Sequence, residues 1–289
     1  MYRLYYLIIL LIFIPFSAFA DTSENCLLLN KISDDKKLNK INYDLLDFSN
    51  CNLIGMNLNE LNLKNINFSD SNLSGSYFYG SDLENADFTN AILYGTNFEA
   101  ANLENADFTN AKLDGSTFRD SNLENADFTN AKLKNANLYK SNLINTNFTN
   151  ADATNANFCG AYLAYMKFDN TVFKNTDLHN AKLMFSDLST SIFENTNFVG
   201  ADLSNANLEN QNLQNSNLYN VNLYDANFDG VNLQNSNLRF ANLINTNLSN
   251  ANLIGADFYN STIKNTEFDG TIFDNTNFFG TTILDNYEP

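Results

Sequence analysis

Large apolar side chains recur at every fifth position over most of the chain. The series begins at Phe48 and ends at Ile283, and Ala153 is the one member that is not Leu, Phe or Ile. A helix repeats its apolar positions about every 3.6 residues and a half-buried strand every 2, so a fixed period of five fits neither. The pattern therefore predicts a turn in every five-residue unit and makes internal repeats the organising feature of the sequence.

The remaining positions of each unit are also regular. A small residue usually lies two positions before the large one, Asn or Asp lies between them, and Asn or Gly usually follows two positions later, as in the segment Ala106–Asn110. Asn and Gly tolerate the left-handed backbone that a tight corner needs. We therefore expect two inward and three outward side chains per unit, which together form a short extended edge and a corner.

A second period, of twenty residues, predicts how many edges make one coil. The octapeptide Glu-Asn-Ala-Asp-Phe-Thr-Asn-Ala occurs at residues 84–91, 104–111 and 124–131. If equivalent residues stack directly, four units make one coil, and the coil is square. About twelve such coils at the spacing of neighbouring strands, about 4.8 Å, predict a rod about 55–60 Å long.

This pattern resembles the pentapeptide-repeat family, whose motif is a small residue, Asp or Asn, Leu or Phe, and two variable positions. The resemblance extends over about four-fifths of the chain. It implies an all-β fold, a right-handed quadrilateral β-helix with four five-residue edges per coil, over residues 43–284. The family has no shared catalytic motif. Homodimers formed end to end occur among proteins that this chain resembles, so an end-to-end homodimer is an expectation here.

The N-terminal residues predict export. Arg3 precedes an apolar run over residues 4–16, and residues 17–20 supply small side chains for cleavage, so residues 1–20 are predicted to be a signal peptide. The apolar run is too short to favour a stable membrane span after cleavage, and retention as an anchor is the alternative. The repeat domain is therefore predicted to be periplasmic or secreted.

Short segments flank the repeats. Residues 21–42 are not in register with the five-residue period and are predicted to cap the first coil, because an uncovered solenoid end is an edge for aggregation. Residues 285–289 form a short C-terminal tail. Either this tail folds over the last coil, or two rods meet there.

The chain contains three cysteines. Cys26 and Cys51 can pair in an oxidising compartment and so tie the N-terminal segment to the first coil. Cys51 also occupies an inward small-residue position, so a buried free thiol is the alternative. Cys159 lies on an outward position and would be left over. We expect no metal site and no cofactor, since there is no Cys-x-x-Cys motif and His179 is the only histidine.

The formal net charge of −17 bears on the partner. Direct nucleic-acid binding is not expected, because it depends on clustered Lys and Arg. An acidic rod can instead mimic nucleic acid and inhibit a DNA-binding protein, as some family members do against topoisomerases, although the predicted export argues against cytoplasmic targets. Glu84, Glu104 and Glu124 are expected to stack in one column, where either a bound cation relieves their repulsion or salt screens a solvated face.

One outward column carries larger side chains than the others. Every twentieth residue from Asn59 to Phe279 gives four tyrosines, the histidine and the two arginines that follow the predicted signal peptide, whereas the column on the opposite edge, from Ser49 to Asp269, is small and polar. Tyr and Arg are enriched at binding hot spots, although an Arg can also simply stack on the tyrosines of its own column. The candidate partner-binding residues of this column are Tyr79, Arg119, Tyr139, His179, Tyr219, Arg239 and Tyr259.

A second candidate surface lies beyond Ala153. Tyr165 and Phe185 stand where Asn or Gly is expected, and they are twenty residues apart, so their rings should stack. Together with Tyr162 and Met184 they form an apolar cluster of the kind that can mark a contact site. The alternative is that the two rings only stack on each other at a corner.

A square rod with a filled core offers no concave, partly dry site for catalysis, so an enzyme is not predicted. The predicted function is a non-enzymatic exported scaffold that binds a macromolecular partner, a protein or a glycan. The predicted contact face is the column of tyrosines and arginines, extended by the patch around Tyr165 and Phe185. The alternatives are the acidic nucleic-acid mimic and a passive structural rod of the envelope.

Overall fold

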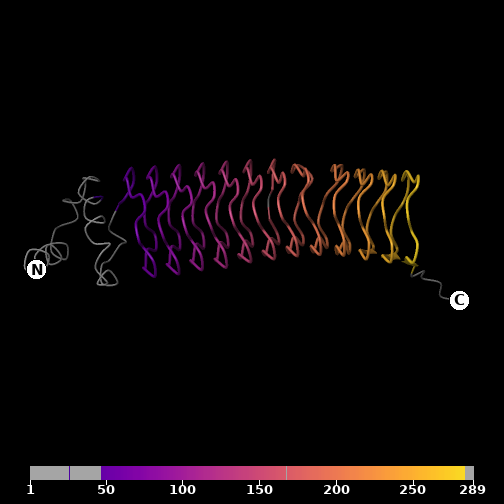
Figure 1. Ribbon diagram of the computed structural model, residues 1–289, viewed down its shortest axis with the longest axis horizontal. Coiled ribbons are helices and arrows are strands. Elements are labelled where there is room, and N and C mark those ends of the chain that lie inside the picture. Colours follow the sequence, from indigo (N-terminus) through magenta and orange to yellow (C-terminus); the bar gives the residue numbers. More distant parts are fainter. Residues whose placement is uncertain (1–25, 27–46, 167, 284–289) are drawn as a thin grey trace, which may run out of the picture.

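The computed structural model describes Cys26 and residues 47–166 and 168–283. The repeats form a long rod of stacked coils that runs from residue 47 at one end to residue 283 at the other (Figure 1). Parallel bridges join residues twenty positions apart, from Asp47 with Asn67 to Asp257 with Asn277. The predicted twenty-residue coil is therefore confirmed.

The pairing becomes longer than a single residue near the C-terminal end. The strands β1 (Asn242–Ile244), β2 (Thr262–Lys264) and β3 (Thr282–Ile283) form a parallel sheet in the order β1-β2-β3, again with partners twenty residues apart. In the rest of the described chain, each edge contributes an isolated bridging residue between turns. This architecture confirms the predicted right-handed quadrilateral β-helix; its predicted first residues, 43–46, and residue 284 lie outside the described residues.

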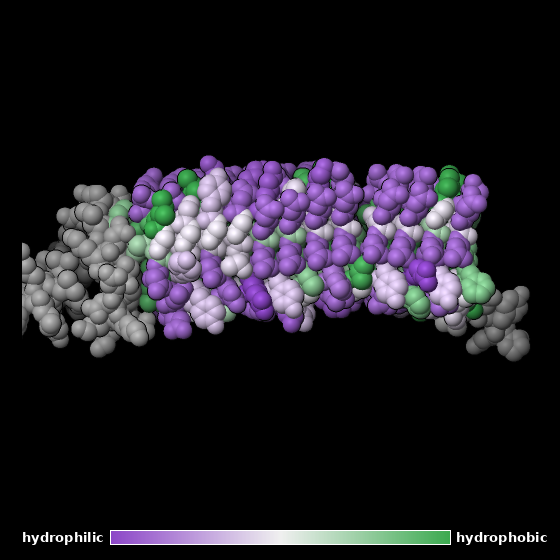
Figure 2. Space-filling view, viewed as in Figure 1, coloured by the Kyte–Doolittle hydropathy of each residue, from purple (hydrophilic) through white to green (hydrophobic). Residues whose placement is uncertain are grey.

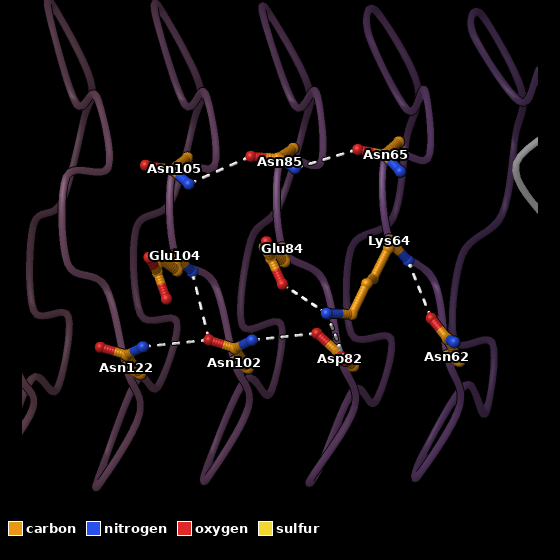
Figure 3. Close-up of polar contacts among 10 residues, drawn as sticks. All are labelled: Asn62, Lys64, Asn65, Asp82, Glu84, Asn85, Asn102, Glu104, Asn105 and Asn122. Carbon is orange, nitrogen blue, oxygen red and sulfur yellow. Dashed lines mark hydrogen bonds and ion pairs between the residues drawn. The ribbon is translucent and has the colours of Figure 1, made fainter.

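Most corners hold one residue with a left-handed backbone. The φ angle is 60° at Asn110 and 70° at Gly115, in the region that Asn and Gly occupy at least cost. The corner asparagines also bind one another along the rod: Asn85 Nδ2 donates to Asn65 Oδ1 at 3.0 Å, and Asn105 Nδ2 donates to Asn85 Oδ1 at 3.1 Å (Figure 3). The same residue type thus makes the turn and links successive coils.

The core is a continuous stack of fully buried Phe and Leu side chains. The ring of Phe108 lies between those of Phe88 and Phe128, with centroids 4.9 and 4.7 Å away and nearly parallel planes. Phe98 and Phe118, on another edge, meet it edge-on at 5.8 and 5.6 Å. Each coil therefore gains its stability from the coils on either side of it rather than from a core of its own.

Many small polar residues at the inward positions are hydrogen-bonded to the preceding coil, and others, such as Ser71, bond within their own coil; Ser116 and Ser261 are buried without a hydroxyl partner. Ser76 Oγ donates to the carbonyl oxygen of Leu53 at 2.8 Å, and Thr171 Oγ1 donates to that of Phe148 at 2.7 Å. A buried hydroxyl group without such a partner would be destabilising. These bonds explain why Ser and Thr replace Ala at many inward positions.

Ala153 is buried at the break in the large-residue series. Phe173, the equivalent residue in the next coil, is larger than usual for this column and contacts the rings of Phe158 and Phe168 at 5.9 and 5.2 Å. On another edge, the stack widens to 6.1 Å between Phe148 and Phe168, whose planes are tilted by 36°. The regular stacking of the rings is thus interrupted around Ala153.

Cys26 and Cys51 are joined by a disulfide, with their Cα atoms 5.5 Å apart, and Cys51 is buried. Of the two alternatives for Cys51, the structure contains the pair rather than the free thiol. The predicted signal peptide (1–20) and tail (285–289) lie outside the described residues, as does the capping segment (21–42) apart from Cys26. Among the residues that the structure describes, no helix is long and apolar enough to span a lipid bilayer.

Candidate functional site

We call the outward residues at every twentieth position from 79 to 279 the Tyr/Arg column. Each follows the central residue of its edge, which is buried in every coil except at Phe278, and a turn fixes its direction. Tyr139 N donates to Asn137 Oδ1 at 3.1 Å, and Arg239 N donates to Asn237 Oδ1 at 3.2 Å. These side-chain-to-backbone bonds two residues apart hold the Tyr and Arg side chains on the outside of the rod.

The N-terminal part of the column is a cation–aromatic stack bordered by carboxylates. The guanidinium carbon of Arg119 lies 5.1 Å from the ring centre of Tyr139, and Lys140 Nζ lies 5.2 Å from the same ring. Arg119 Nε is 3.0 Å from Asp120 and 3.9 Å from Glu99, and the hydrogen bond to Asp120 raises the pKa of the guanidinium. The positive charge of Arg119 is therefore already balanced within the column.

The C-terminal part of the column is a larger aromatic cluster. Phe240 contacts Tyr219 and Tyr259 edge-on, with ring centres 5.4 and 5.9 Å away. Arg239 lies 4.5 Å from the centre of the Tyr259 ring, and Phe279 stacks on Tyr259 at 5.9 Å. The side chains of Tyr219, Phe240 and Phe279 stay exposed. The cluster therefore combines mutual packing with apolar surface that faces solvent.

Smaller side chains separate these two groups. Cys159, His179 and Val199 occupy the intervening coils and are half-buried. Burial, and then the nearby Asp177 carboxylate, raise the pKa of the Cys159 thiol, which makes it a poor nucleophile at neutral pH. Within residues 47–166 and 168–283 and at Cys26, no group of three or more His, Cys, Asp or Glu side chains could hold a metal ion.

The second candidate surface lies on a different part of the rod. The rings of Tyr165 and Phe185 stack as predicted, 5.1 Å apart with planes 3° from parallel, and Tyr162 beside them is exposed. The Tyr/Arg column runs along the edge that ends at residue 180, whereas Phe185 is at the far corner of the next edge. The patch and the Tyr/Arg column therefore lie on adjacent edges of the rod.

Several exposed aromatic residues lie outside the two surfaces predicted from the sequence. Phe240 belongs to the C-terminal cluster. Like Tyr165, it is an aromatic residue at a corner position where Asn or Gly is usual, and this feature of the sequence could have identified it. Tyr77 and Tyr94 are exposed in the early coils, together with Ile54. Figure 2 shows pale and green side chains among the hydrophilic ones near this end of the rod. Their columns are otherwise mostly polar, so a comparison of whole columns did not single them out.

Two family models match the chain. The model of the pentapeptide repeat region matches residues 45–118, 81–158 and 201–278, and a model of eight pentapeptide repeats matches residues 156–195. Together these matches cover more than half of the chain. No curated protein matches it.

Several solved structures are similar to this chain. HetL of Nostoc sp. strain PCC 7120, a pentapeptide repeat protein involved in the regulation of heterocyst differentiation, is 28% identical; the match covers 79% of this chain and 89% of HetL, with a TM-score of 0.41. Rfr23 of Cyanothece 51142 is 26% identical, with 50% and 90% covered and a TM-score of 0.27. QnrB1, a plasmid-mediated fluoroquinolone resistance protein, is 16% identical, with 82% and 91% covered and a TM-score of 0.28.

Proposed function

The chain belongs to the pentapeptide-repeat family, and on that premise we propose that it is an exported, non-enzymatic scaffold that binds a macromolecular partner through the Tyr/Arg column. Repeat rods offer long continuous surfaces for binding, because each coil adds its own outward side chains. The partner is a protein or a glycan. The observation that carries the proposal is the exposure of Tyr219, Phe240 and Phe279 in one connected cluster.

The contrast between opposite edges supports this assignment. At the equivalent positions across the rod, the column from Ser49 to Asp269 has only Ser, Thr, Asp and Glu side chains. Tyr and Arg bury a large area on binding and keep a polar tip, which is why they dominate binding hot spots. The rings held by Arg119 and Arg239 are also restrained before binding, so less conformational entropy is lost.

Two observations support export. The N-terminal residues have the pattern of a signal peptide, and the Cys26–Cys51 disulfide is of a kind that persists in oxidising compartments such as the periplasm or the extracellular space. We therefore place the scaffold in one of those two compartments.

The proposed scaffold can also associate with a second copy through its C-terminal end. The described part of the last coils leaves Phe273, Phe278 and Ile283 exposed, where equivalent residues of other coils are buried. A second rod placed end to end would cover them. This contact and the Tyr/Arg column would not compete, except near Phe279.

An acidic mimic of nucleic acid is the second candidate. The acidic side chains on the edge that carries the column from Ser49 to Asp269 favour it. In the sequence, Lys167, which lies outside the described residues, is the one basic residue among the repeat units of this edge. Several of its carboxylates nevertheless have structural roles, since Asp87, Asp107 and Asp127 each accept a hydrogen bond from the backbone N–H two residues later. The acidic side chains along it are Asp47, Asp70, Asp87, Asp107, Asp127, Asp169, Asp187, Glu209, Asp229, Glu267 and Asp269.

The proposed function predicts that a triple variant, Tyr139→Asn, Tyr219→Asn and Arg239→Asn, loses its partner but keeps its fold. Asn59 occupies the same column, so Asn is suited to each position. The lost cation–aromatic contacts are exposed and contribute only about 0.5–1 kcal/mol each. Affinity capture from envelope extract and from a polysaccharide panel should retain a macromolecule on the wild-type chain but not on the variant.

The matched control is the triple variant Thr129→Ser, Glu209→Ser and Asp229→Ser on the opposite edge, where Ser49 shows that Ser is suited. This control should bind as the wild type does. Equal retention by both triple variants would remove the Tyr/Arg column from the binding site. Capture of DNA-binding proteins that only the opposite-edge control loses would instead favour the nucleic-acid mimic.

A further inference from the structure

An apolar patch lies on one edge of the rod. We define it by Ile144, Tyr162, Tyr165, Met184 and Phe185, which lie on three successive coils. Tyr162, Tyr165 and Phe185 are 53%, 60% and 51% exposed, a large fraction for aromatic residues of a rigid repeat. The Tyr/Arg column lies on the preceding edge.

The backbone under the patch is in an unfavourable conformation for its side chains. Tyr165 and Phe185 have φ angles of 61° and 59°, in the left-handed region that Asn and Gly occupy at other corners. Bulky residues there are strained, and such strain is typical of functional positions. The pair also interrupts a corner column that has hydrogen-bonded asparagines on either side of it, at Asn65–Asn85 and at Asn245–Asn265. Folding alone would favour Asn at both positions.

The charge next to the patch defines the chemistry of its partner. Going toward the N-terminal end, the outward column of Ile144 and Met184 continues as Glu124, Glu104 and Glu84. Lys64 shows how this row accepts a cation, because its Nζ binds Glu84 and lies 3.3 Å from Asp82 (Figure 3). No ion pair within the described residues reaches Glu104 or Glu124. Stacked like charges of this kind repel each other unless a cation lies between them.

We propose that this edge binds a segment of a partner protein that has Lys or Arg residues next to apolar residues. The cationic side chains bind Glu104 and Glu124, and the apolar ones cover Tyr165, Met184 and Phe185. From Glu104 to the level of Phe185 the edge extends over four coils, about 19 Å, which is the length of about six residues of extended chain. The inference does not depend on the Tyr/Arg column and would hold if that column bound nothing.

The test uses a fluorescent synthetic peptide of about twelve residues, with four lysines followed by four leucine or phenylalanine residues, titrated against the full chain by fluorescence anisotropy. Two further peptides carry Glu in place of Lys or Ser in place of the apolar residues. The first peptide should bind saturably, and more weakly as NaCl is raised, because salt screens exposed charges. The other two should bind at least about tenfold more weakly.

Two double variants separate the contributions of charge and apolar contact. Glu104→Gln with Glu124→Gln should weaken peptide binding about fivefold and reduce its salt dependence. Tyr165→Asn with Phe185→Asn should weaken it about tenfold and, since the strain is relieved, raise Tm by about 2–4 °C. The matched control is Asp107→Asn with Asp127→Asn, which removes two charges at similar heights on the adjacent edge, where Asn147 occupies the same column. This control should bind as the wild type does.

Several outcomes would overturn the proposal. One is the absence of saturable binding to the wild-type chain. Another is an equal loss of affinity in the Glu104/Glu124 variant and in the adjacent-edge control, which would mean attraction to net charge only. Unchanged affinity in the Tyr165/Phe185 variant would exclude these two side chains from the peptide-binding site. Binding of phosphatidylcholine vesicles in place of the peptide, lost in that same variant, would assign the patch to a lipid surface instead.

Discussion

Replacement of Phe108 by alanine is expected to lower the free energy of unfolding by about 3–5 kcal/mol, the usual loss for a fully buried Phe. The ring contacts Phe88 and Phe128 face to face and Phe98 and Phe118 edge-on, so the cavity would adjoin four other rings. Because each coil is stabilised mainly by its neighbours, the effect should extend along the stack. Urea unfolding followed by circular dichroism measures the shift in midpoint.

Phe279→Ala provides the control for this prediction. Phe279 is 74% exposed, and its loss should change the free energy of unfolding by less than about 1 kcal/mol. A Phe108→Ala variant as stable as the Phe279→Ala variant would contradict the view that the stacked rings hold the coils together.

The positions of the core and the corners could be predicted from the sequence because each depends on local geometry that repeats. A residue such as Phe108 is inward because every fifth residue is inward, and Asn110 has a positive φ because the square coil needs a corner there. The octapeptide repeated every twenty residues fixed the number of edges per coil. A shift of one residue in the five-residue register would have moved the large apolar residues from the core to outward positions. The unbroken period therefore excluded any other register.

The details of the outer surface depend on side-chain conformation and were harder to predict. That Phe240 joins Tyr219 and Tyr259 in one cluster depends on how a corner residue reaches a neighbouring column. Stacking of Tyr165 on Phe185, by contrast, was predictable from their spacing of twenty residues. The order of edges around the coil, counted from residue 180 to residue 185, also places this pair on the edge that follows the one carrying the Tyr/Arg column.

The ion pair between Lys64 and Glu84 was also not predicted from the sequence. The column of Glu84, Glu104 and Glu124 was expected either to bind a cation or to be a solvated face screened by salt, and the residue twenty positions before Glu84 is a lysine that binds it. Extending the column by one coil would have found this pair. Counting in steps of twenty residues toward the C-terminal end, from Glu124, leads to Ile144 and Met184 of the apolar patch. The sequence therefore contained both ends of the proposed binding edge, and the structure showed which acidic residues remain without an ion pair.

Removal of the disulfide by the double substitution Cys26→Ser and Cys51→Ser is expected to destabilise the N-terminal end of the rod by about 3.5 kcal/mol. The bond closes a loop of 25 residues, and in the chain-entropy model this loop accounts for stabilisation of that size. Serine is a suitable replacement at position 51, because Ser71 occupies the equivalent inward position of the next coil and donates to the carbonyl oxygen of Phe68 at 2.6 Å. The midpoint of urea unfolding should fall accordingly.

Two controls separate the disulfide from a general effect of cysteine replacement. Cys159→Ser, which removes the half-buried free thiol, should leave the midpoint nearly unchanged. Dithiothreitol should lower the wild-type midpoint to that of the double variant and leave the double variant as it was. If the reduced and oxidised wild-type chains unfold together, the bond does not stabilise the rod.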